Sequence, residues 1–159
     1  MRLRAIRNAT ILLAIVVTIG CDRVTKHVAM TTLAGGPSQS FLADTVRLVY
    51  AENAGGFLGA GADMDPFART LLFTVLTGLC LAAMAAGALM RRWNAVAALG
   101  LALFLAGGAS NWYDRVARGS VVDFLNVGLG PVRTGIFNAA DVALMFGAVL
   151  FVFGETRRK

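Results

Sequence analysis

Four long apolar segments, separated by shorter stretches that hold most of the polar residues, dominate the chain. A membrane-spanning helix needs about 20 mostly apolar residues. Helices are therefore predicted over residues 6–29, 66–90, 93–116 and 136–154. The pattern is typical of a mainly α-helical, polytopic membrane protein, in which a single membrane-embedded domain of residues 1–159 is built on a four-transmembrane-helix bundle.

The two longer connections, residues 31–65 and 117–134, contain patterns typical of β-strands. The stretch "TVRLVYAEN" (45–53) alternates large apolar residues with others at a period of two, as a half-buried strand does. The stretch "SVVDFLNVGLG" (120–130) is rich in β-branched residues and then in glycine, which suggests a second strand that ends in a turn. We expect these segments to form a small β-cradle over the mouth of the bundle.

Composition supports a membrane protein and argues against several other classes. The chain is 57% hydrophobic and only 15% charged, whereas a soluble domain carries about 25% charged residues. The net charge of +6 does not indicate nucleic-acid binding, because the basic residues flank apolar segments and do not form one large cluster. With two cysteines, Cys21 and Cys80, and the single histidine His27, no zinc-site spacing and no histidine-dependent triad is expected. We expect neither a metal nor a cofactor.

The basic residues also predict the orientation in the membrane. Three groups of them precede the first span, connect the second to the third, and follow the fourth: Arg2, Arg4, Arg7, Arg91, Arg92, Arg157, Arg158 and Lys159. With four spans these groups fall on one side, so both termini are expected to be cytoplasmic and residues 31–65 and 117–134 extracytoplasmic. The bias is moderate, because the outward segments also contain Arg47, Arg118 and Arg133.

The N-terminal segment has a second interpretation. Residues 1–21 combine a basic start, an apolar run and a small residue before Cys21, a pattern that resembles a bacterial lipoprotein signal. Cleavage there would leave an odd number of spans and would disrupt the charge topology. We therefore favour a retained first helix.

Ionisable residues inside membrane spans indicate function by default, and here they gather at one end of the bundle. The predicted outward ends of three spans carry Asp22, Arg23, Lys26, His27, Ser110, Asn111, Asp114, Arg115, Asn138 and Asp141. Structural roles account for some of them. Asp22 and Lys26 are four residues apart and can form an ion pair, and an ion pair between Asp114 and Arg115 is also expected. Cys21 is expected in the core.

Two carboxylates, Asp123 and Asp141, are the candidates for catalysis. If they meet, charge repulsion in a low-dielectric site keeps one of them protonated. The ionised carboxylate can then deprotonate water while the protonated one polarises a carbonyl oxygen. This chemistry requires neither a metal nor a histidine. Asp141 alone could instead cap a helix or pair with an arginine.

Several stretches together resemble the lipoprotein signal peptidases (signal peptidase II), aspartyl peptidases of the bacterial inner membrane. They occur in the order "DRVTK" (22–26), "ENAGGF" (52–57), "GGASNWYDR" (107–115), "VVDF" (121–124) and "FNAAD" (137–141). The combination of "VVDF" with "FNAAD" after an apolar helix is the most specific part.

The resemblance implies removal of the signal peptide from diacylglyceryl-modified prolipoproteins by cleavage before the lipidated cysteine. It implies that Asp123 and Asp141 form a catalytic dyad near the outer leaflet of the inner membrane. The residues that it assigns to substrate binding or site support are Asn53, Gly55, Gly107, Asn111, Arg115, Asn138, Asp22 and Lys26. The partners that it implies are prolipoprotein substrates, membrane lipid and a globomycin-type inhibitor, and we expect a monomer.

The chain departs from the family pattern at two places. The "NAGGF" stretch is one residue shorter than usual, and Ser110 occupies a position where glycine is usual. The chain is therefore expected to be a divergent paralogue whose substrate preference or inhibitor sensitivity differs, although both aspartates are present.

Two other functions compete with the peptidase hypothesis. A small transporter or channel subunit could use Asp141 as an ion site, but it would need polar residues toward the cytoplasmic side, where the second and fourth spans are apolar. A non-catalytic lipoprotein-binding factor would tolerate loss of Asp123.

Overall fold

A computed structural model of the chain describes residues 2–157. Arg158 and Lys159, which contribute to the charge argument for the orientation, lie outside these residues. The helices and strands in chain order are α1 (Arg2–Thr32), β1 (Gln39–Phe41), β2 (Val46–Asn53), η1 (Phe57–Gly59), α2 (Pro66–Thr70), η2 (Leu71–Leu76), α3 (Thr77–Met90), α4 (Ala95–Arg118), β3 (Val121–Leu129), β4 (Val132–Arg133) and α5 (Ala139–Thr156).

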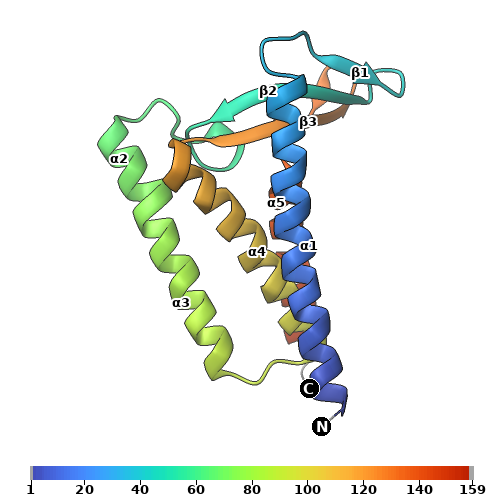
Figure 1. The fold of residues 1–159 in the computed structure, drawn as a ribbon, viewed down its shortest axis with the longest axis vertical. Coiled ribbons are helices and arrows are strands. Elements are labelled where there is room, and N and C mark those ends of the chain that lie inside the picture. Colours follow the sequence, from blue (N-terminus) through green and yellow to red (C-terminus); the bar gives the residue numbers. More distant parts are fainter. Residues whose placement is uncertain (1, 158–159) are drawn as a thin grey trace.

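Within residues 2–157, four helical segments are long and apolar enough to cross a membrane. They are α1, the continuous segment formed by α2, the π-helical η2 and α3, then α4 and α5. The predicted fold class, four transmembrane helices with a small antiparallel sheet, is confirmed. The sheet covers one end of the bundle, and α1 begins and α5 ends at the other (Figure 1).

Capping residues make two helices begin later than the hydrophobic pattern predicts. Before α4, the side chain of Asn94 accepts a hydrogen bond from the backbone N–H of Ala97 at 2.8 Å, so the helix begins at Ala95. Before α5, Asn138 caps in the same way and the helix begins at Ala139. Such caps supply partners for the free N–H groups of a first turn. Hydrophobicity alone does not report them.

Helix α4 is central and contacts α1, α3 and α5. Glycines bring α4 and α5 close together. A Cβ atom added at Gly147 of α5 would lie 2.5 Å from the backbone nitrogen of Phe104, and one added at Gly107 of α4 would meet the carbonyl oxygen of Ala140. Membrane helices commonly use small residues in this way, because van der Waals packing replaces the hydrophobic effect between them.

The sheet has the strand order β1-β2-β3-β4, and all its neighbours are antiparallel. The strands predicted over 45–53 and 120–130 are therefore confirmed as β2 and β3. Their register pairs Ala51 with Asp123 and Asn53 with Val121. This register brings the first half of β3 and the end of β2 together directly above the helices (Figure 1).

A small apolar core joins the sheet to α1. Ala29 of α1 and Leu33, which directly follows α1, pack with Val122 of β3, and all three are buried. By contrast, Cys21 and Cys80 are exposed free thiols, so the expectation that Cys21 lies in the core was wrong. Lipid-facing surfaces of membrane helices are as apolar as their packed faces, and hydrophobicity therefore does not distinguish the two.

Candidate active site

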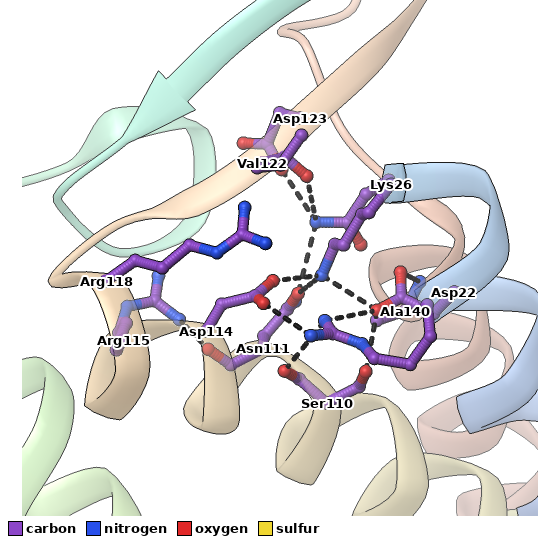
Figure 2. Close-up of polar contacts among 12 residues, drawn as sticks. Asp22, Lys26, Ser110, Asn111, Asp114, Arg115, Arg118, Val122, Asp123 and Ala140 are labelled. Atoms are coloured by element: carbon purple, nitrogen blue, oxygen red, sulfur yellow. Dashed lines mark hydrogen bonds and ion pairs between the residues drawn. The ribbon is translucent and has the colours of Figure 1, made fainter. Parts of the chain in front are cut away.

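Most of the polar residues predicted at the outward helix ends meet beneath the sheet (Figure 2), whereas His27 is exposed. Asp123 from β3 and Asp141 from α5 both line one cavity of about 280 Å³, together with Asn53, Asn111 and Arg115. We call this the carboxylate cavity. The two candidate carboxylates, 18 positions apart in sequence, thus face the same space.

Asp123 is held by two side-chain amides. Its side chain is buried, and Asn138 Nδ2 donates to its Oδ1 at 2.7 Å while Asn53 Nδ2 donates to its Oδ2 at 3.1 Å. Burial raises the pKa of Asp123 to about 6, and the negative charge of Asp141 acts in the same direction. The hydrogen bonds from Asn53 and Asn138 favour the ionised form and limit this increase.

Asp141 lies in the first turn of α5, where it forms a capping box with Asn138. Its backbone N–H donates to Asn138 Oδ1 at 2.9 Å, and its Oδ2 accepts from the Asn138 N–H at 3.1 Å. The partial positive charge of a helix N-terminus stabilises a carboxylate at this position. Asp141 is therefore not an isolated charge within an apolar span, because both the helix end and its hydrogen bonds compensate it.

Two amides connect the carboxylates to each other. Asn111 Nδ2 donates to Asp141 Oδ1 at 2.8 Å, and Asn111 Oδ1 accepts from Asn138 Nδ2 at 3.1 Å. Asn138 is fully buried and bonds both aspartates: its side-chain amide donates to Asp123, and both its backbone N–H and its side-chain oxygen bond Asp141. A displacement of Asn138 would therefore be felt at both carboxylates.

A buried ionic cluster lies below this amide pair. Lys26 Nζ is 2.8 Å from Asp22, 2.7 Å from Asp114 and 2.8 Å from the Oδ1 atom of Asn111. Arg23 adds a second cation, 2.6 Å from Asp114 and 3.2 Å from Asp22. The predicted ion pair between Asp22 and Lys26 is confirmed. The cluster balances two aspartates with two cations and positions Asn111 through Lys26.

The expected ion pair between Asp114 and Arg115 was wrong. Neighbouring residues on a helix point in different directions, so Asp114 turns toward α1 while Arg115 turns toward the β2–α2 loop. There its guanidinium donates to the carbonyl oxygen of Gly55 at 2.5 Å. Arg115 also interacts electrostatically with both candidate carboxylates.

The two glycines that were predicted to support the site, Gly55 and Gly107, have different surroundings. Gly55 lies in a tight loop, where an added Cβ atom would be 2.5 Å from the carbonyl oxygen of Ala60. Gly107 packs against the backbone of Ala140, and its neighbour Gly108 lines the carboxylate cavity instead.

Sequence reasoning assigned no site role to Ser110 or to the backbone of Ala140. Ser110 Oγ donates to Asp22 Oδ2 at 2.6 Å, and the Ala140 N–H donates to Asp22 Oδ1 at 3.0 Å. These bonds tie the ionic cluster to α4 and to the first turn of α5. The unusual serine was a visible signal, whereas a backbone donor leaves none in the sequence.

A second cavity, of about 510 Å³ and almost entirely apolar, extends along α5 as far as Asp141. Phe57 and Leu58 of the β2–α2 loop line both this apolar cavity and the carboxylate cavity, as do Asp141 and Met145. An apolar ligand can therefore lie along α5 with its polar end at the carboxylates.

Comparisons with known proteins agree with this arrangement. A family model described as "Signal peptidase (SPase) II" matches residues 14–156. The lipoprotein signal peptidase of Desulforapulum autotrophicum is 33% identical over 145 residues, which cover 86% of this chain and 85% of that protein. The lipoprotein signal peptidase of Mycobacterium tuberculosis is 36% identical over 154 residues, which cover 92% of this chain and 71% of that protein.

Solved structures give the same result for the fold. A bacterial membrane enzyme determined by the in meso method at 1.9 Å resolution has a TM-score of 0.80 and 26% identity, and the match covers 95% of each chain. A second such structure, at 2.3 Å resolution, has a TM-score of 0.81 and covers 94% of this chain and 88% of that one.

Proposed function

The chain belongs to the signal peptidase II family of membrane peptidases, and we propose that it is an aspartic endopeptidase for lipoprotein precursors. Its relatives are lipoprotein signal peptidases, which indicates that this chain removes signal peptides from prolipoproteins. The proposed substrate is the diacylglyceryl-modified form, and the proposed cleavage site is the peptide bond before the lipidated cysteine.

One observation supports the aspartic mechanism most strongly. The carboxylates of Asp123 and Asp141 line one cavity, and each accepts hydrogen bonds from two N–H donors. In the proposed mechanism the ionised carboxylate takes a proton from water, and the hydroxide attacks the scissile carbonyl. The protonated carboxyl donates to the carbonyl oxygen as its charge develops. The carboxyl that took the proton from water then gives it to the leaving amine as the C–N bond breaks, and the hydroxyl of the tetrahedral intermediate returns a proton to the other carboxylate as the carbonyl reforms.

The raised pKa of Asp123, about 6, supports a shared proton at near-neutral pH. Because the two groups interact, their titration belongs to the pair. Arg115 provides a positive charge beside both carboxylates, and the side chains of Asn53, Asn111 and Asn138 fix the positions of the carboxylate oxygens. We propose Asp22 and Lys26 as support for Asn111, and Gly55 as the loop contact for Arg115.

The apolar cavity supports a lipidated, membrane-embedded substrate. Phe57, Leu58, Phe137, Val142 and Phe146 provide an apolar surface that ends at Asp141. A diacylglyceryl-bearing cysteine could lie here with its acyl chains toward lipid, while the peptide backbone enters the carboxylate cavity. A globomycin-type inhibitor would occupy the same space.

We further propose a monomer in the bacterial inner membrane, with both termini cytoplasmic and the carboxylates near the outer leaflet. The arginines at positions 4, 7, 91 and 92 lie at the end of the bundle opposite to the carboxylates, as the positive-inside rule expects. Ser110, a departure from the family pattern, donates to Asp22. It therefore alters the support of the site without replacing either carboxylate.

The proposal is tested by incubating the purified full-length protein with a lipidated prolipoprotein and measuring the products by intact-mass spectrometry. We expect a product whose new N-terminus is the diacylglyceryl-modified cysteine. The same precursor without the lipid should be cleaved much more slowly. A product cut elsewhere would contradict the proposed cleavage site, and binding without cleavage would favour a lipoprotein-binding factor.

A further inference from the structure

A third cavity opens at the end of the bundle opposite to the carboxylates and extends inward as far as Ile19 and Ala109. It has a volume of about 630 Å³ and runs between α1 and α3 with α4 as its floor. Its mouth carries four arginines, Arg4 and Arg7 of α1 together with Arg91 and Arg92 between α3 and α4. We call it the arginine groove. We propose that it binds one anionic phospholipid, with the phosphate among these arginines and an acyl chain along the groove.

Among the residues that the structure describes, no acidic side chain forms an ion pair with the arginines of the groove. All four arginines are exposed. Basic pockets between transmembrane helices are known to bind anionic headgroups, and guanidinium groups bind phosphate by paired, charge-assisted hydrogen bonds. The positive-inside rule requires only that arginines lie on this side. It does not explain why arginines of α1 and arginines of the α3–α4 connection face one groove.

The walls of the groove suit an acyl chain. On α1 they are formed by Ile11, Ile15 and Ile19, which recur every four residues and thus share one helix face. On α4 the lining extends from Ala98 to Ala109. At about 1.5 Å per residue this stretch is about 16 Å long, close to half of a hydrocarbon core of about 30 Å. The groove therefore has the depth of one leaflet.

An aromatic residue marks the level of the headgroup. Trp93 lines the groove beside the arginines and donates from its indole N–H to the carbonyl oxygen of Ala88 at 3.1 Å. The guanidinium of Arg91 lies 4.8 Å from its ring centroid. Tryptophan is enriched at the interface between the hydrocarbon core and water. The arginines accordingly lie at the depth of the phosphates, and α1 and α3 lie on either side of α4 to enclose the chain (Figure 1).

Native mass spectrometry of the full-length protein in detergent tests this proposal. The protein is titrated with phosphatidylglycerol and with phosphatidylcholine of identical acyl chains. The variants are Arg91→Gln, Arg92→Gln and Arg91→Lys. The matched control is Arg157→Gln, which removes one exposed charge near the end of α5 and outside the groove. Thermal unfolding in the same detergent verifies that each variant is folded.

We expect phosphatidylglycerol to bind at least tenfold more tightly than phosphatidylcholine. Each arginine-to-glutamine change in the groove should weaken this binding about fivefold, because each basic residue near the surface contributes about that factor. Arg91→Lys should retain part of the affinity for phosphatidylglycerol, and Arg157→Gln should change this affinity less than twofold. Ala98→Leu, which fills the groove without a charge change, should also weaken binding.

Three results would overturn the proposal. The first is equal binding of the two lipids, and the second is an effect of Arg157→Gln as large as that of the groove variants. The third is full displacement of the lipid by glycerol phosphate at comparable concentration, which would indicate a site for free phosphate. None of these results depends on peptidase activity, so the lipid site and the proposed function can fail independently.

Discussion

Replacement of Asn138 provides the sharpest test of how the two carboxylates are held. Its side chain makes two separable contributions: Oδ1 caps α5 by accepting from the Asp141 N–H at 2.9 Å, and Nδ2 donates to Asp123 at 2.7 Å. Asn138→Ala removes both contributions. Asn138→Ser retains a capping oxygen, because serine is a good N-cap residue, but it cannot provide the amide donor to Asp123.

The expected magnitudes differ for the two contributions. Loss of an N-cap reduces the free energy of unfolding by about 1 kcal/mol. Loss of a hydrogen bond to a charged, buried group is worth about 1.5–3 kcal/mol. If that bond is needed in the reacting state, kcat falls about 10- to 100-fold, at about 1.4 kcal/mol per factor of ten. Loss of the amide donor also raises the pKa of Asp123 further above its ordinary value, so the pH optimum should move upward.

Both quantities can be measured on the same samples. Unfolding is followed in detergent, and cleavage of a lipidated prolipoprotein is followed by gel shift at several pH values. Asn138→Ser should recover the stability that Asn138→Ala loses, but it should not recover the rate. Full recovery of kcat in Asn138→Ser, or a rate within twofold of wild type in Asn138→Ala, would refute the reasoning, because Asn138 would then act only as a helix cap.

Three further predictions concern stability. Lys26→Met leaves two buried aspartates with a single cation, and denaturant titration should show a loss of about 3–5 kcal/mol in the free energy of unfolding; a loss below about 1 kcal/mol would contradict the cluster. Gly107→Ala, whose Cβ atom would meet the α5 backbone, should lose about 1–3 kcal/mol by the same titration, whereas Gly87→Ala, which has open space, should be neutral or slightly more stable. Asp123 binds a proton more tightly when folded, since its pKa is about 6 against an ordinary 3.8, so wild-type stability should fall by up to about 3 kcal/mol as pH rises from 4 to above 6. Unfolding curves of Asp123→Asn should lack this decline, and an identical decline in the variant would rule out Asp123 as its source.

The hydrophobic pattern predicted the helices and both long strands because membrane helices and half-buried strands have different periods. It did not predict where α4 and α5 begin, because Asn94 and Asn138 cap these helices and a cap is a local hydrogen bond. It also placed Cys21 in the core, since an apolar residue facing lipid cannot be distinguished in sequence from one facing another helix.

The sequence indicated which polar residues lie at one end of the bundle, but it did not indicate how their side chains connect. The carboxylates and asparagines were visible as polar residues at one end of apolar helices. The partners of Asp114 were not visible in the sequence. Arg115 was expected because it is the neighbouring residue, whereas Lys26 and Arg23 of α1 contact Asp114 across the α1–α4 interface. The donation of the Ala140 backbone N–H to Asp22 has no side-chain signal at all. Contacts between distant elements and contacts by backbone are the two kinds that this sequence did not reveal.

The proposed dyad is tested most directly by the single-turnover rate at which purified Asp123→Asn and Asp141→Asn cleave a lipidated prolipoprotein. Asp63→Asn, an isosteric change at an exposed aspartate, serves as the matched control. Because each carboxyl is proposed to transfer a proton in the reaction, both site variants should be slower than wild type by at least about 10³-fold, while the control should be unchanged. A rate above a tenth of wild type in either folded site variant would contradict the dyad.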